Sequence, residues 1–323
     1  MVRAARRFLQ DHVFSRPKVG LVGVFGRLLR LGQVLYPELS PPNIRHRALL
    51  ASQAISEFRT IQAWYATLSD NPELAAALER FPEIQGAIYW PYIHSRWSVS
   101  KRLEVVASHY RCLDGRAKVL ACAVHRDVEL ASLEREYRGL RLILDKARWF
   151  VREGEAVLNI FVGNERLFSL AFTLGAEGGK LVTYVGALQG SNVRENWPVY
   201  REITKSLHRM RPRDLLVATL RLLCQELRVS KIYAISNNFR HHQGAYFGDC
   251  KAEKLLLNYD EVWAEHGGVR LNNGFFEIPV APVYREISEL PTRKRALYRR
   301  RYRMMDGVVD DIARICRGQG TLN

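Results

Sequence analysis

The stretch VLNIFVGNERLFSLAFTLGAEGGKLVTYVGAL, residues 157–188, decides the fold class of this chain. It contains three short apolar runs, at residues 157–162, 167–174 and 181–188. The segments between them, Gly163-Asn164-Glu165-Arg166 and Gly175-Ala176-Glu177-Gly178-Gly179, supply residues that accept the positive φ of a tight hairpin. Short apolar runs bounded by such turns are typical of strands, so the stretch predicts a β-meander of three strands.

Downstream of the meander, helical and strand patterns alternate. Residues 197–208 have a helical pattern, and a second helix is expected from Pro212, because proline fits the first turn of a helix. The run at residues 231–236 predicts a strand directly after these helices. Strand, helices and strand form an α/β crossover, which makes the expected sheet mixed. A further strand is expected at residues 274–280, followed by a basic C-terminal helix.

Upstream of the meander, the pattern is largely helical to about residue 113. Residues 44–69 and 98–112 have apolar side chains at helical spacing. Asn71 followed by Pro72 predicts a helix start, since asparagine caps a helix and proline suits its first turn. The run at residues 118–124, in contrast, is interpreted as a strand.

Together these patterns predict an α/β (α+β) protein in which a helical region precedes a mixed β-sheet with packed helices. The expected division is an N-terminal helical region over residues 1–113 and a C-terminal mixed α/β domain over residues 114–323, which ends in the basic helix. With 323 residues, 47% of them hydrophobic, the chain can bury a large core, which excludes wholesale disorder and coiled-coil architectures.

The net charge of +16 is concentrated at the two ends of the chain. Residues 1–30 hold seven basic side chains and one acid, and residues 293–323 hold nine basic side chains and three acids. Each end therefore contributes +6, which leaves only +4 for the 262 residues between them. A local excess of this kind indicates an anionic partner, either a membrane surface or a nucleic acid.

One C-terminal run accounts for most of the excess at that end: seven of its eleven residues are basic and none is acidic. The basic residues are Arg293, Lys294, Arg295, Arg299, Arg300, Arg301 and Arg303. On a helix they form a dense stripe, which suits an anionic leaflet or the phosphates of a nucleic acid. The alternative is a solvated helix whose arginine stems pack on the body of the protein.

Five widely spaced cysteines without a C-x-x-C pair indicate neither a disulfide framework nor a zinc site, and no bound metal is expected. The apolar run at residues 19–25 is too short and too interrupted by glycine for a signal peptide. The sequence has no stretch that approaches the roughly 20 apolar residues needed to span a bilayer. The expected location is therefore the cytoplasm, with peripheral contact to the inner membrane.

The first candidate ligand site covers residues 185–192, where a strand is expected to run through a glycine-containing turn into a helix. Its candidate ligand-binding residues are Gly186, Gln189, Gly190, Ser191 and Asn192. Free backbone N–H groups at such a junction can hold a phosphate or pyrophosphate. A plain turn between a strand and a helix would need the same small residues.

The second candidate is the loop at residues 236–246, which follows a predicted strand at the place where open α/β sheets bind ligands. His241 and His242 in this loop are candidates for acid–base catalysis, as is Glu265, which precedes His266. Adjacent histidines on an extended segment point to opposite sides and make a poor metal pair. A solvated polar loop would have the same composition.

Five separated motifs occur along the chain. They are Trp90-Pro91-Tyr92-Ile93, Tyr184-Val185-Gly186-Ala187-Leu188-Gln189-Gly190, Leu207-His208-Arg209-Met210-Arg211-Pro212, Tyr259-Asp260-Glu261-Val262-Trp263-Ala264-Glu265, and the tail from Pro291 to Tyr302. In this order they resemble the VirK/YbjX family of Gram-negative bacterial proteins, and the resemblance covers about residues 35–315.

This resemblance implies a biological setting more than a mechanism. Members of the family are linked to virulence, to surface-protein localisation and to resistance against antimicrobial peptides, and some are membrane-associated. The resemblance therefore implies an accessory protein of the cell envelope, which would meet an anionic membrane surface or envelope component through its basic ends. Nucleic-acid binding by the same basic stripe is a further hypothesis.

The order of meander, glycine-containing turn, helix and strand is also similar to the acetyltransferase (GNAT) fold, in which such a turn holds the cofactor pyrophosphate. That similarity implies an acyl-group transferase that uses acyl-CoA or acyl-carrier protein. Residues 186–192 would surround the pyrophosphate, and Glu265, His241 or His242 would be the base. The turn lacks the usual Q/R-x-x-G-x-G/A signature, and two helices stand where that fold has one.

Overall fold

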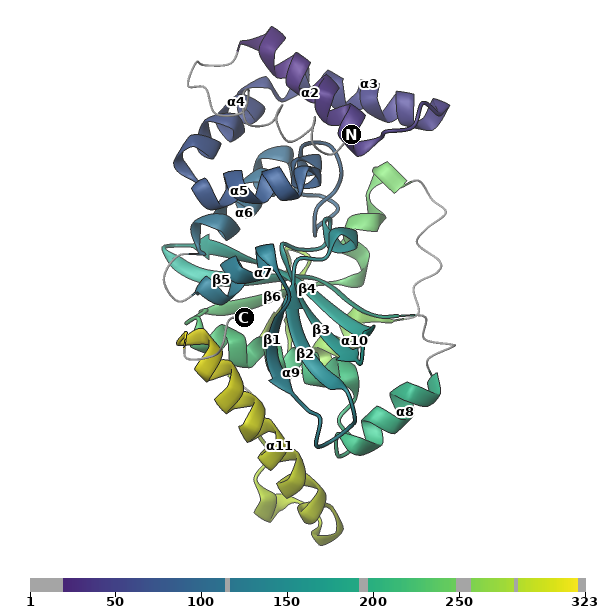
Figure 1. Cartoon of the computed structure of the whole chain (residues 1–323), viewed down its shortest axis with the longest axis vertical. Coiled ribbons are helices and arrows are strands. Elements are labelled where there is room, and N and C mark those ends of the chain that lie inside the picture. Colours follow the sequence, from purple (N-terminus) through teal and green to yellow (C-terminus); the bar gives the residue numbers. More distant parts are fainter. Residues whose placement is uncertain (1–19, 114–116, 192–196, 248–256, 282–283, 319–323) are drawn as a thin grey trace.

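The computed structural model describes residues 20–113, 117–191, 197–247, 257–281 and 284–318. The molecule is elongated, with a layer of helices above a twisted sheet and one long helix at the lower end (Figure 1). A continuous hydrophobic cluster extends from Val24 and Leu50 in the helical layer, through the sheet, to Met304 and Ile312 in the long helix. The helical region and the sheet therefore share one core.

The N-terminal helices form the upper layer, as the sequence predicts. They are α2 (Leu21–Leu35), α3 (Pro41–Ser56), α4 (Phe58–Thr67), α5 (Pro72–Arg80) and α6 (Val99–Arg111), with 3-10 turns η1 (Leu68–Asp70) and η2 (Pro82–Ile88). The predicted cap at Asn71 is confirmed, because its side-chain oxygen accepts a hydrogen bond from the N–H of Leu74 at 3.1 Å. Its Nδ2 donates to the carbonyl of Ala107 at 3.0 Å, so the cap also ties α5 to α6.

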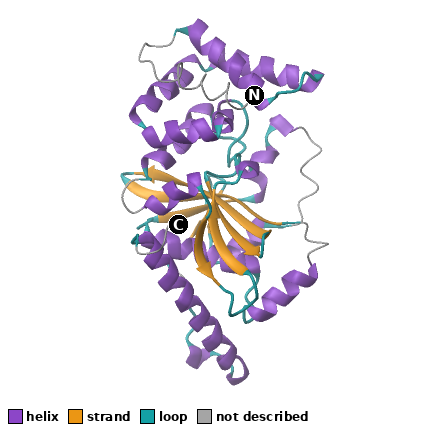
Figure 2. Cartoon of the chain, in the orientation of Figure 1, coloured by secondary structure: helices purple, strands orange, loops and turns teal. Residues whose placement is uncertain are grey.

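In the described part of the chain, the sheet has eight strands in the order β1-β2-β3-β4-β5-β6-β8-β7. Figure 2 shows the strands together as one twisted sheet with helices around it. The strands are β1 (Val128–Ser132), β2 (Leu140–Asp145), β3 (Ala156–Val162), β4 (Glu165–Glu177), β5 (Lys180–Gly190), β6 (Lys231–Ile235), β7 (Val269–Arg270) and β8 (Phe275–Ile278). The predicted meander is confirmed as the antiparallel strands β3, β4 and β5. Its two turns have positive φ at Gly163, Gly178 and Gly179, which glycine accepts without strain.

Strands β5 and β6 are parallel, and the helices α8 (Trp197–Ser206) and α9 (Pro212–Glu226) connect them. The neighbouring pairs, β4 with β5 and β6 with β8, are antiparallel, so the prediction of a mixed sheet is confirmed. Helix α9 starts at Pro212, as expected, and its leucines are buried along most of its length.

In the part of the chain that the structure describes, three short turns follow β6, and two helices lie beyond them. They are η5 (Asn237–Phe239), η6 (His241–Gln243), η7 (Ala245–Phe247), α10 (Tyr259–Glu265) and α11 (Thr292–Cys316), with the turn η9 (Ile287–Glu289) before α11. The predicted basic C-terminal helix is thus confirmed as α11.

The predicted strand at residues 118–124 is wrong, because these residues form helix α7 (Lys118–His125). Its buried residues are Val119, Leu120, Ala123 and Val124. These positions recur after four residues and share one helical face, so the run covers the sheet instead of joining it. The strand β1, which follows α7, pairs with β2 at the edge of the sheet.

Candidate functional site

The parallel strands β5 and β6 separate at their carboxyl ends. Their pairing ends with Val185 opposite Ala234. Strand β5 continues to Gly190, and beyond Val185 its edge that faced β6 has no described strand beside it. The hydroxyl of Tyr259, in α10, accepts a hydrogen bond from the N–H of Leu188 at 2.7 Å and fills part of the gap. Open α/β sheets bind ligands at the carboxyl ends of their strands, beside such a crossover.

A cavity of about 570 Å³ lies at this gap. It is lined by Trp90, Arg148, Trp149, Val151, Arg152, Glu153, Gln189, Arg240, His241, His242 and Phe247. These residues come from the chain after η2, the segment around the turn η4 (Arg148–Phe150), the end of β5, and the loop after β6. Among the residues expected from the sequence, the cavity brings together Gln189, His241 and His242.

Glu153 and His241 form a titratable pair in the cavity wall. Nε2 of His241 lies 3.4 Å from Oε1 of Glu153, and the two side chains are only 11% and 13% exposed. Burial raises the pKa of Glu153 to about 7, although the nearby Arg152 and Arg240 act in the opposite direction. A carboxyl that titrates near neutrality beside a histidine can accept and release a proton at physiological pH.

Two guanidinium groups flank this pair. Arg240 is 5% exposed and lies 3.8 Å from the ring centroid of Tyr259. Arg152 lies over the rings of Trp90, at 4.4 Å, and Phe247, at 5.1 Å. Because these two cations face a carboxyl that is only partly ionised at pH 7, the cavity favours an anionic ligand.

The segment after Trp90 holds the loops of the cavity together. The N–H of Ile93 donates to the carbonyl of Arg152 at 2.7 Å, and the N–H of Ser95 donates to the carbonyl of Phe239 at 2.8 Å. Ile93 is fully buried and has a φ of +55°, which is rare for a β-branched residue. Strained residues of this kind are concentrated at functional sites, and here the strain lets one short segment reach both loops.

The first candidate segment differs from its expected conformation, since strand β5 continues to Gly190 where a turn was expected. Gly186 sits at a β-bulge, where the register with β4 shifts between Ala171 and Phe172. A side chain at Gly186 would collide with the carbonyl oxygen of Glu153. The glycine is therefore needed for the close approach of the loop that carries Glu153, because only glycine leaves room for it.

The five residues of this segment have different surroundings. Gln189 lines the cavity, and Gly190 pairs with Phe168 of β4. The N–H of Ser191 donates to the carbonyl of Leu167 at 2.7 Å. Asn192 lies outside the described residues. The role of these positions in holding a phosphate stays a prediction.

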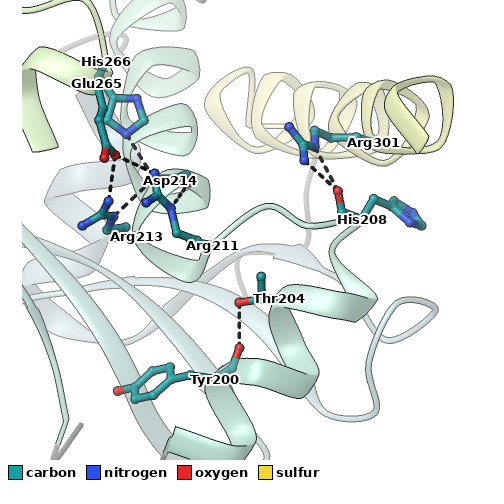
Figure 3. Close-up of polar contacts among 9 residues, drawn as sticks. All are labelled: Tyr200, Thr204, His208, Arg211, Arg213, Asp214, Glu265, His266 and Arg301. Atoms are coloured by element: carbon teal, nitrogen blue, oxygen red, sulfur yellow. Dashed lines mark hydrogen bonds and ion pairs between the residues drawn. The ribbon is translucent and has the colours of Figure 1, made fainter. Parts of the chain in front are cut away.

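Glu265 lies away from the cavity, at the opposite end of α10 from Tyr259. Its Oε2 accepts hydrogen bonds from Arg211 at 2.6 Å and from Arg213 at 2.7 Å, both near the start of α9 (Figure 3). The structure therefore does not bring the expected trio of Glu265 and the two loop histidines into one site. The expectation rested on Glu265 standing next to His266 in the sequence, and that adjacency does not determine which end of α10 lies near the cavity.

The basic run forms the N-terminal part of α11, whose lower end extends away from the sheet (Figure 1). The exposed members are Arg293, Lys294, Arg299, Arg300 and Arg303. Arg295 instead donates to the carbonyls of Leu290 and Ser288 at 2.9 and 2.8 Å. Arg301 donates twice to the carbonyl of His208, at 3.2 and 2.7 Å (Figure 3). Two of the seven basic residues are therefore hydrogen-bonded to the protein and five are exposed, and binding of an anionic partner by the exposed ones stays a prediction.

Sequence reasoning missed Arg152 and Glu153, the two residues that give the cavity most of its chemistry. They lie in Arg152-Glu153-Gly154-Glu155, which has the composition of an ordinary charged turn before a strand. Trp90 belongs to a motif that carries the family resemblance, but a Trp-Pro pair by itself indicates no reaction.

The described ranges contain no cluster of three or more His, Cys, Asp or Glu side chains placed to hold a metal ion. In the same ranges, every helix is too short or too polar to cross a membrane.

Fold and cavity define the class: a mixed α/β protein with a cationic, aromatic-walled cavity at the carboxyl ends of a parallel strand pair. Comparison with known proteins identifies the family. Residues 41–314 match the family described as "Protein of unknown function (DUF535)", and the chain belongs to this family.

The relatives confirm the VirK/YbjX resemblance. The chain is 28% identical over 261 residues to the "Uncharacterized protein YbjX" of Escherichia coli (strain K12), which covers 79% of this chain and 78% of the relative. It is 27% identical over 225 residues to an "Uncharacterized protein" of Haemophilus influenzae, which covers 69% of this chain and 74% of the relative. No solved structure gives a significant match.

Proposed function

We propose that this protein is an acyl-group transferase whose active centre is the cavity between the ends of β5 and β6. The observation that carries the proposal is the Glu153–His241 pair, 3.4 Å apart, in a wall that also holds Arg152 and Arg240. Acyl transfer from an anionic donor requires a base that works near neutral pH and cations that bind the donor. The order of strands, a meander followed by a parallel crossover strand, supports the similarity to acetyltransferases.

The donor would be acyl-CoA or acyl-carrier protein, whose acyl group is held as a thioester on a phosphate-bearing arm. Arg152 and Arg240 suit the phosphate, because guanidinium groups donate paired hydrogen bonds to it. The end of β5, which β6 leaves unpaired beyond Val185, would lie along the arm. The rings of Trp90 and Phe247 offer apolar walls for the acyl chain.

Glu153 and His241 would move the proton in this reaction. The carboxylate of Glu153, or Nε2 of His241, takes the proton of an acceptor hydroxyl or amine while the acceptor atom bonds to the thioester carbonyl carbon. The carbon–sulfur bond then breaks, and the proton passes from the pair to the departing thiolate. With the pKa of Glu153 raised to about 7, both protonation states are populated at neutral pH, as both steps require.

Calorimetry with acyl-CoA and with acyl-carrier protein tests the proposal. We expect both Arg240→Gln and Arg152→Gln to weaken donor binding by at least about tenfold. Glu153→Gln should bind the donor but slow transfer by about a hundredfold or more. The matched control is Glu265→Gln, whose carboxylate is bound by Arg211 and Arg213, and it should transfer at the wild-type rate. No binding at millimolar donor would rule the proposal out.

The cell envelope is the setting that we propose for this activity, with the roles in virulence and peptide resistance that the family resemblance implies. An acyl group added to an amphiphilic envelope component would change the surface that a cationic peptide meets. The five exposed cations of the basic run in α11 support contact with an anionic partner, either the membrane surface, an envelope component or a nucleic acid. Binding to anionic vesicles, compared with a DNA and RNA gel shift, separates these partners.

The matched variants for this contact come from α11 itself. Changing Arg299, Arg300 and Arg303 together to Glu reverses three exposed charges without touching the arginines that hold the helix to the body. Loss of binding to only one of the partners would identify that partner. Unchanged binding to all of them would mean that α11 is a solvated helix.

A further inference from the structure

The helix pair α2–α3 exposes most of the large apolar side chains that lie open on the described surface. Nine of the twelve such residues fall between positions 21 and 55. Phe25 and Leu29 on α2 are each 41% exposed, whereas Ile44 and Ile55 on α3 are 51% and 74% exposed. Single apolar residues are scattered over most protein surfaces, but a concentration of this kind marks a contact surface.

The spacing of these residues places them on one outward face of each helix. Leu21, Phe25 and Leu29 are four residues apart on α2. Ile44 and Ile55 lie about three helical turns apart on α3. The buried residues of α2 start at Val24 and occupy a neighbouring face, which packs on the body. Helix α2 therefore has two apolar faces: one packs in the core, and the other faces outward.

The charges on the pair are of one sign. Helices α2 and α3 contain four arginines and no Asp or Glu. The guanidinium of Arg27 lies over the ring of Tyr65, in α4, at 4.6 Å, and Arg47 donates to the carbonyl of Tyr36 at 2.9 Å, so both of these groups contact the protein. Arg45 is exposed. An apolar face bordered by arginines complements acidic lipid headgroups above acyl chains, whereas two copies of this face would bring like charges together.

The position of the pair fits a flat surface. It forms the outermost layer at the upper end of the molecule, whereas the basic part of α11 lies at the lower end (Figure 1). One bilayer can therefore contact only one of the two. The pair is also joined to the cavity, since the hydroxyls of Tyr36 and Tyr246 lie 2.9 Å apart and Tyr246 precedes Phe247 in the cavity wall.

We propose that the outward face of α2–α3 is the surface with which this protein binds an anionic membrane. Leu21, Phe25 and Leu29 enter the boundary between headgroups and acyl chains, and the exposed Arg30 and Arg45 contact the lipid phosphates. The proposal rests on the membrane contact proposed above, but it assigns that contact to α2–α3 and leaves α11 free for another anionic partner. In this orientation the cavity lies beside the membrane, where an amphiphilic acceptor would reach it.

Flotation of the full chain with vesicles tests the assignment. The vesicles contain equal parts of phosphatidylethanolamine and phosphatidylglycerol, and phosphatidylcholine vesicles serve as the neutral comparison. Phe25→Ser with Leu29→Ser should weaken binding to the anionic vesicles by at least about tenfold, because both side chains leave the bilayer boundary. The matched control Val269→Ser, at a residue 66% exposed on β7, should bind as the wild type does.

The α11 variant with Arg299, Arg300 and Arg303 changed to Glu separates the two membrane hypotheses. We expect it to keep vesicle binding within about threefold of the wild type. If it loses binding while the α2 variant retains it, the assignment to α2–α3 is overturned and the contact through α11 stands. If the wild type ignores anionic vesicles, both hypotheses fail. If the α2 variant instead turns a dimer into a monomer in light scattering, the face covers a second copy of the chain.

Discussion

The ammonium nitrogen of Lys146 lies 2.5 Å from Oε2 of Glu155, and these side chains are only 4% and 0% exposed. The hydroxyl of Tyr110, in α6, donates to the same oxygen at 2.7 Å. The hydroxyl of Tyr92, after η2, donates to Oε1 at 3.1 Å. One buried carboxylate thus joins the helical region to the sheet, two residues from Glu153 in the cavity wall.

Lys146→Met should therefore destabilise the fold strongly. It leaves the Glu155 carboxylate buried without its cation, which costs about 3–5 kcal/mol of unfolding free energy. The double variant Lys146→Met with Glu155→Gln should lose less, because a neutral amide leaves no buried charge without a partner and its oxygen still accepts one of the two tyrosine hydrogen bonds. Urea unfolding of both variants measures the difference. If both variants lose the same unfolding free energy, the unpaired charge of Glu155 is not the cause of the loss.

Glu153→Gln should make the protein more stable at alkaline pH while it slows the proposed transfer. Burial raises the pKa of Glu153 to about 7 from an ordinary value of 4.5, so the folded state binds its proton more tightly than the unfolded state does. Wild-type stability therefore falls as the pH rises from about 4.5 to 7, by up to about 3 kcal/mol. The variant lacks this loss. Unfolding curves of both proteins at pH 4.5, 6 and 8 measure this difference. If the unfolding free energies of the two proteins change with pH in parallel, the pKa of Glu153 is not raised.

Gly186→Ala should disturb the cavity by displacing the loop that carries Glu153. The new methyl group would collide with the backbone of Glu153, which cannot move aside as a flexible side chain could. We expect a loss of about 3 kcal/mol in unfolding free energy, together with weaker donor binding, because the loop that carries Glu153 must shift. Gly307→Ala, in α11, is the control. A Cβ there meets no atom within 4 Å, so it should stabilise the helix by about 0.5–1 kcal/mol.

Arg301→Ala should separate the structural arginines of α11 from the exposed ones. It removes both hydrogen bonds to the carbonyl of His208, which we expect to cost about 1–2 kcal/mol. Arg299→Ala, at an exposed position, should change stability by less than about 0.5 kcal/mol. Thermal unfolding of the two variants measures this difference. A larger loss for Arg299→Ala would mean that α11 is held to the body through a different set of contacts.

Features that depend on neighbouring residues could be predicted from the sequence. The turns at Gly163 and Gly178-Gly179 require positive φ, and the structure has it at each of these glycines. Asn71 caps α5 because the amide oxygen reaches the N–H three residues ahead in any chain with this local conformation. These elements follow from short-range sterics and hydrogen bonding, so their local sequence is sufficient.

The run at residues 118–124 shows where such local rules fail. A short apolar run fits a buried strand and a buried helical turn equally well, and only the neighbouring elements decide between them. Here the run packs on the sheet as α7, and the edge of the sheet is formed by β1. The extension of β5 to Gly190 has a similar cause, since its partner β4 is long enough to pair with it.

The sequence by itself determined the class of the protein: a helical front, a meander, a crossover to a mixed sheet, and a basic last helix. Only the tertiary structure decided which side chains meet. Glu153 and Arg152 precede β3, His241 and Arg240 follow β6, and the order of the strands brings them to one cavity. Periodicity and turn chemistry act over a few residues, whereas such contacts depend on strand register and on where each loop crosses the sheet. For that reason the chemistry of the cavity became visible only in the folded chain.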